Sequence, residues 1–147
     1  MDNKIAEMLV DIGGLALAII TLLCIAGVVI YLVGRSRLFK KCGKEGWKAI
    51  IPIYSDYVFY CEICGLHWIW FVLIMACEVG ATKEGYVGTF TTIVNGLAFY
   101  NFGIKCNKDK YKTLLLGALF EPFVTVYYGF ANINYDPSIE VKQSGLF

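Results

Sequence analysis

Charged residues and histidine are both scarce in this sequence. Of the 147 residues only 17% are charged, whereas 58% are hydrophobic, and the mean hydropathy is +0.61. A water-soluble domain needs roughly a quarter of its residues charged, so the composition excludes an ordinary soluble domain and favours a bilayer protein. The sequence has no glycine-rich phosphate loop and no Walker motif. Because it has one histidine, it offers few candidates for general acid–base catalysis. We expect no binding to nucleic acid.

The hydrophobic residues gather in four runs, each of which predicts a membrane-spanning helix. The runs cover residues 12–34, 66–80, 86–104 and 113–131. The first has 23 residues without an ionisable side chain, and a helix of that length covers about 35 Å, enough to cross a bilayer. A signal peptide would have an apolar core of about 7–15 residues behind a basic segment, whereas acids outnumber bases here, so we expect a retained helix. The four runs predict an all-α integral membrane four-helix bundle, a single membrane domain over residues 1–147.

The stretch from residue 49 to residue 80 is too long for one crossing and too short for two. We expect it to divide at Gly65. Residues 50–64 then form an amphipathic segment that lies in the membrane interface or re-enters the membrane, with Ser55 and Glu62 on its polar face. Aromatic anchors at the level of the lipid headgroups are expected at Trp47, Trp68 and Trp70.

Basic residues concentrate in two loops. Residues 35–48 carry +5 and residues 105–112 carry +3, whereas the two tails and the turn between the second and third runs sum to −3. By the positive-inside rule both basic loops are cytoplasmic, so four crossings put both termini outside the cell membrane. Lysine and arginine beside an anionic leaflet gain roughly 1 kcal/mol each, so we expect the loops to contact anionic lipid headgroups.

Several sequence blocks resemble one family. They are Gly46-Trp47-Lys48-Ala49-Ile50-Ile51-Pro52-Ile53-Tyr54, Gly65-Leu66-His67-Trp68-Ile69-Trp70, Phe120-Glu121-Pro122-Phe123 and Tyr128-Gly129-Phe130-Ala131. Over about residues 38–135 the sequence is similar to a family of small bacterial four-helix membrane proteins of unknown function. The resemblance implies a fold and a location but no activity. Two positions depart from it, since Ser55 replaces the usual asparagine and Glu121 replaces a usual apolar residue.

Some members of that family carry a signal peptidase I label by automatic transfer. Such an enzyme needs a nucleophilic serine close to a methionine, a lysine base and a sizeable extracytoplasmic domain. The sequence has four serines, none of which begins a Ser-x-Met, and the predicted outer segments are short. We therefore expect no such activity, and no enzyme or cofactor.

The fourth run contains the sharpest candidate site. Gly117, Glu121, Thr125 and Gly129 recur at intervals of four, which turns the Glu121 carboxyl group toward a neighbouring helix. The third run offers matching small and polar residues, among them Thr92 and Asn95. With no lysine or arginine in any span, we expect Glu121 to be neutral and hydrogen-bonded to Asn95 or a threonine. It would serve either as a contact between helices, the favoured interpretation, or as a proton or cation relay.

The other polar candidates are weaker. Cys61 and Cys64 form a C-x-x-C pair followed by His67, but a structural zinc needs four ligands and no second pair exists. Buried, small apolar cysteines are therefore the favoured interpretation, and we expect no metal. We expect Glu78, Asp56 and Glu62 to face solvent or the interface.

Two hypotheses of function follow. The leading one is a non-enzymatic membrane protein that associates through its small-residue stripes with a second copy or with another membrane protein. The alternative is a small oligomeric channel or proton-coupled carrier that uses Glu121.

Overall fold

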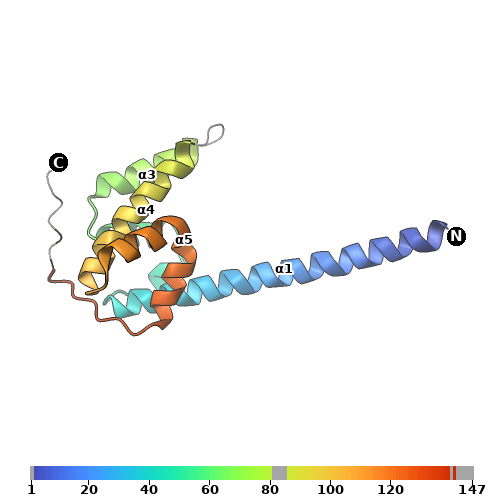
Figure 1. The fold of residues 1–147 in the computed structure, drawn as a ribbon, viewed down its shortest axis with the longest axis horizontal. Helices are drawn as coiled ribbons and strands as arrows, with labels where there is room; N and C mark the ends of the chain where they lie inside the picture. The colour runs from blue at the N-terminus through green and yellow to red at the C-terminus, as the bar shows by residue number, and fades with distance from the viewer. Residues whose placement is uncertain (1, 81–85, 140, 142–147) are drawn as a thin grey trace.

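The computed structural model describes residues 2–80, 86–139 and 141, and all of the regular secondary structure over these residues is helical (Figure 1). This confirms the all-α prediction for the described part of the chain. The Lys83–Glu84 turn and the Glu78 side chain lie outside the described residues. In chain order the elements are α1 (Asp2–Lys41), the 3₁₀ turn η1 (Gly46–Ala49), α2 (Pro52–Tyr57), the π-helical turn η2 (Val58–Ile63), α3 (Trp68–Gly80), α4 (Tyr86–Lys105) and α5 (Lys110–Phe130).

Helix α1 is a single long rod of which only the last part joins the rest of the molecule (Figure 1). Residues 12–30 are exposed on every side although they are almost wholly apolar. A helix that is apolar all round needs either a protein core or lipid around it, and no part of the chain that the structure describes covers this one. The helix also continues seven residues past the predicted end of the first span, so the first basic loop begins as helix.

Among the described residues, two helices have the length and apolar composition needed to cross a membrane, namely residues 12–41 of α1 and the whole of α5. The described apolar part of α3, Trp68–Cys77, is shorter. These helices support a membrane protein, but the structure does not confirm the predicted four-helix bundle, because residues 12–30 of α1 stand apart from the other helices (Figure 1).

The expected division at Gly65 is present. Gly65 has a φ of +71°, which favours glycine, and it separates η2 from α3. The preceding segment begins with Pro52 at the first helical position, where the missing N–H costs nothing. The prediction that Ser55 lies on a wet face is wrong, because its side chain is only 2% exposed. Of the three tryptophans predicted as anchors, Trp47 and Trp68 are exposed, whereas Trp70 is half-buried and stacks on Phe90.

Helix α5 bends back on itself, whereas the sequence predicted one crossing over residues 113–131. Phe120 has non-helical backbone angles (φ −134°, ψ 39°), just before Pro122, whose ring cannot fit a regular helix. In a straight helix Thr113 and Tyr128 would be separated by roughly 22 Å of rise. Their hydroxyl oxygens lie 3.4 Å apart, so the two arms of α5 fold toward each other.

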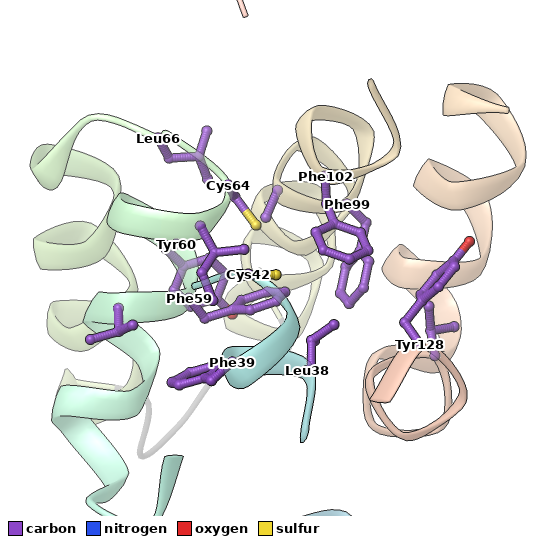
Figure 2. Close-up of a cluster of buried hydrophobic side chains, with 14 of the residues drawn as sticks. Leu38, Phe39, Cys42, Phe59, Tyr60, Cys64, Leu66, Phe99, Phe102 and Tyr128 are labelled. Atoms are coloured by element: carbon purple, nitrogen blue, oxygen red, sulfur yellow. The ribbon is translucent and has the colours of Figure 1, made fainter. Parts of the chain in front are cut away.

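The hydrophobic core lies at the basic end of α1. Leu38 and Phe39 of α1 pack among Phe59, Phe99 and Phe102, all of them fully or almost fully buried (Figure 2). Two helices end beside this core, and at each end a lysine from another element donates hydrogen bonds to backbone carbonyls. Lys41 Nζ donates to the Gly129 and Ala131 carbonyls at 2.6 Å each, and Lys105 Nζ donates to the Ile63 carbonyl at 3.0 Å. Lysines suit this place because the last carbonyls of a helix have no partner within the helix.

Candidate functional site: a polar cavity at the helix junction

A polar cavity of about 260 Å³ lies where the helices meet. It receives residues from α1, α2, η2, α3, α4 and α5, so every element except η1 contributes to its wall. Its lining residues are Tyr31, Arg35, Asp56, Tyr60, Ile74, Thr91, Asn95 and Glu121. A cavity with an arginine and two carboxyl groups is unusual in a chain with so few charges, and it is the candidate site.

Arg35 is the cation of this cavity. It is 6% exposed, and its Nη2 lies 2.5 Å from Asp56 Oδ1 in an ion pair. Its Nη1 donates to the Tyr31 hydroxyl one turn earlier on α1, and its guanidinium carbon lies 5.5 Å from the centre of the Phe59 ring. The Nε atom is buried without a hydrogen-bond partner among the described residues. Both Nη atoms of Arg35 are therefore hydrogen-bonded to the protein, and Nε is the guanidinium nitrogen without a partner among the described residues.

Glu121 lies at the bend of α5 and has two hydroxyl partners. Its Oε1 accepts from Thr125 Oγ1 at 3.2 Å and from Tyr31 Oη at 3.4 Å. The expectation of a threonine partner therefore agrees with the geometry. Asn95 instead accepts from Tyr60 Oη at 2.5 Å, on the cavity wall that faces η2. Thr92 donates to a backbone carbonyl of α4, and its neighbour Thr91 lines the cavity.

The sequence reasoning missed Arg35 and Asp56 as site residues. Arg35 follows the predicted end of the first span by one residue and was assigned to a cytoplasmic loop, while Asp56 was assigned to a solvated face. The expectation that Glu121 has no cation near it is wrong, since Arg35 acts on it electrostatically across the cavity. The only sequence signal for Arg35 as a site residue is its position directly after an uncharged helical run.

The C-x-x-C pair and His67, the weak metal or redox candidate of the sequence, lie apart from the cavity. Cys61 is half-buried, Cys64 is fully buried, and both are free thiols. Burial raises the pKa of the Cys64 thiol well above its ordinary value, and it raises the pKa of Cys61 as well, so neither is a reactive thiolate. His67 is exposed, and its ring packs against that of Trp68 with ring centres 5.7 Å apart. Within the described part of the chain no three His, Cys, Asp or Glu side chains are arranged to hold a metal ion.

The comparisons with known proteins give a family but no activity. No curated protein and no solved structure matches the chain. A family model described as "Family of unknown function (DUF5684)" matches residues 47–137, which include Asp56, Tyr60, Asn95 and Glu121 of the cavity but not the two residues on α1. This match covers more than half of the chain. The protein therefore belongs to this uncharacterised family.

Proposed function

We propose that this chain is a non-enzymatic integral membrane protein that acts as a small proton-coupled carrier, or as a channel if it oligomerises. The supporting observation is the convergence of Arg35, Asp56 and Glu121 on one cavity at the inner end of the α1 span. Ionisable groups within membrane helices are costly and mark ion or substrate pathways by default. Irregular helices at membrane depth are tolerated where they line a cavity, and η2 and the bend of α5 both do so here.

The direct test is flux through purified protein in liposomes that contain a pH-sensitive dye. Wild-type vesicles with an imposed proton gradient should show a pH-dependent flux. Glu121→Gln keeps the size of the side chain and a hydrogen-bonding group but cannot release a proton, so it should remove this flux. Glu45→Gln makes the same chemical change at an exposed loop residue and should keep it. A wild type that moves no protons with Na⁺, K⁺, methylammonium or acetate refutes the carrier.

For the membrane topology, we infer that the C-terminal segment lies on the same side as both basic loops. The Ala131 carbonyl, just past α5, accepts from Lys41, and the Asp136 amide donates to the Lys105 carbonyl at 2.9 Å. The bend at Phe120 supports this arrangement, because it returns the chain to the side from which α5 starts. Under the positive-inside rule this side is cytoplasmic and the N-terminus is outside, in place of the two outer termini expected from four crossings.

This topology is testable with two C-terminal fusions of the full chain in a bacterial host. Green fluorescent protein becomes fluorescent in the cytoplasm, whereas alkaline phosphatase is active outside it. The inferred topology predicts a fluorescent first fusion and an inactive second one. The reverse pair of results would restore the topology with both termini outside.

Association through α1 is the second candidate function. It is supported by residues 12–30, which no other part of the described chain covers, and by Gly13, Gly14 and Gly27, where an added Cβ atom would meet nothing within 4 Å beyond its own stretch of helix. Small residues of this kind let two membrane helices approach closely. Cys24 is exposed in the same region, so oxidative cross-linking in membranes should give a disulfide dimer that Cys24→Ser abolishes. No cross-link at any oxidant concentration would speak against a dimer through this helix.

A further inference from the structure

The charges that face Glu121 can be counted from every element around it. Helix α1 brings Tyr31 and Arg35, α2 brings Asp56, and η2 brings Tyr60. The contributions of α3 and α4 are uncharged, and the hydroxyl partner on α5 itself is uncharged as well. Arginine stays protonated in proteins, and here its charge is matched by the carboxylate 2.5 Å away. One carboxyl group, that of Glu121, is therefore in excess.

Burial of an ionised carboxylate without a counter-charge is unfavourable, so the excess carboxyl group needs one positive charge to neutralise it. A proton on the group itself meets this need when no ion is bound. A bound monovalent cation meets it equally well, provided that oxygen atoms surround it. The cavity wall offers such oxygens in the Glu121 carboxyl group and in the side chains of Tyr31, Tyr60, Thr91 and Asn95.

We propose that the cavity takes a monovalent cation, either an alkali ion or a small protonated primary amine, in exchange for the proton of Glu121. This proposal rests on the carrier proposed above and names its solute. The exchange balances: the carboxylic acid loses its O–H bond, the proton leaves to water, and the carboxylate that remains is paired with the cation. The total charge of the cavity is zero before and after the exchange.

Other solutes fit the charges less well. A divalent cation would leave one uncompensated positive charge, and the described residues hold no group of three candidate metal ligands. A small anion would have to displace Asp56 from Arg35 or use the single free Nε donor, and it would need an extra proton to keep the cavity neutral. Anion binding would therefore take up a proton, whereas cation exchange releases one.

The sign of the proton change gives a test that does not depend on transport. Detergent-solubilised full-length protein in weak buffer with a pH dye is titrated separately with NaCl, KCl and methylammonium chloride. A titration with sodium acetate tests an anion, and it is compared with the NaCl titration. Binding of the cation is followed by calorimetry. We expect one proton released for each cation bound, with an apparent Kd that rises about tenfold for each unit of pH decrease while Glu121 holds its proton. Comparison of the Na⁺, K⁺ and methylammonium titrations tells the alkali ion from the amine.

Two variants and a control complete the experiment. Glu121→Gln should abolish both binding and proton release, Glu121→Asp should retain release because it keeps a carboxyl group, and Glu45→Gln should behave as wild type. Proton uptake with acetate, cation binding without proton release, or no binding of any of the three cations overturns the proposal. If exchange occurs in detergent but no flux occurs in liposomes, the solute class stands and the carrier fails. If flux occurs without such exchange, the carrier stands and the solute class fails.

Discussion

The close contact between α1 and the end of α5 can be tested with one methyl group. A Cβ atom at Gly129 would lie 2.7 Å from the carbonyl carbon of Gly34 and 2.9 Å from its Cα, and nearer still to its oxygen. Ordinary contact begins at 3.4 Å, so Gly129→Ala requires the two backbones to separate by at least 0.7 Å. Backbone atoms cannot rotate out of the way as a side chain can. Overpacking of this kind costs typically 1–3 kcal/mol, so we expect the free energy of unfolding to fall by at least about 1 kcal/mol.

Gly88→Ala is the matched control for this prediction. It makes the same change in α4, where an added Cβ meets nothing within 4 Å, and alanine is favoured over glycine in a helix by about 1 kcal/mol. Unfolding in mixed micelles, followed by tryptophan fluorescence, gives both free energies. If Gly129→Ala is as stable as Gly88→Ala, then α5 does not return to α1 as described. The grounds for a C-terminus on the side of the basic loops would then be lost.

Three further outcomes are expected from the contacts described above. Asp56→Asn removes the counter-charge of a buried guanidinium and should destabilise the fold by roughly 3–5 kcal/mol. Glu62→Gln removes a charge from the partly exposed pair with Lys44 and should cost under about 1 kcal/mol in the same micelle assay. Burial raises the pKa of the Cys42 thiol from 9.0 to about 12, so above pH 9 the unfolded thiol ionises while the folded one keeps its proton. Stability should therefore fall between pH 9 and pH 12, and Cys42→Ala should show a shallower fall; an identical pH profile contradicts this. Tyr135→Phe removes the 2.8 Å hydrogen bond to the Ile63 carbonyl and should cost about 1 kcal/mol, with faster amide hydrogen exchange after η2 as a second measure.

The buried thiols have neighbours that cysteine spacing does not predict. The C-x-x-C pattern placed Cys61 beside Cys64 in the sequence, but the helical turn gives the two side chains different surroundings. Cys64 is instead buried near Cys42 and Cys106, which come from distant parts of the chain. Spacing along one helix cannot reveal such neighbours, because packing between helices creates them.

The sequence by itself determined the local features of this protein. Helical content, the long apolar run of α1, the break at Gly65 and a distortion near Pro122 follow from side-chain chemistry within a few residues of each position. The family match covers residues 47–137, close to the residues 38–135 over which the resemblance was drawn. These features depend on backbone freedom, missing N–H groups and hydropathy, all of which can be read from neighbours in the chain.

Only the tertiary structure decided which charges meet. The ion pair of Arg35 with Asp56, and their convergence on Glu121, join residues separated by 21 to 86 positions, and no periodicity of a single helix encodes such a distance. The direction of α5 after its bend was equally open, because proline fixes where a helix distorts and not where it goes next. That direction depends on the close approach of Gly129 to Gly34 and on Lys41 at the carbonyls of the helix end. Packing between distant segments therefore brings three of the few charged residues, Arg35, Asp56 and Glu121, into the wall of one cavity.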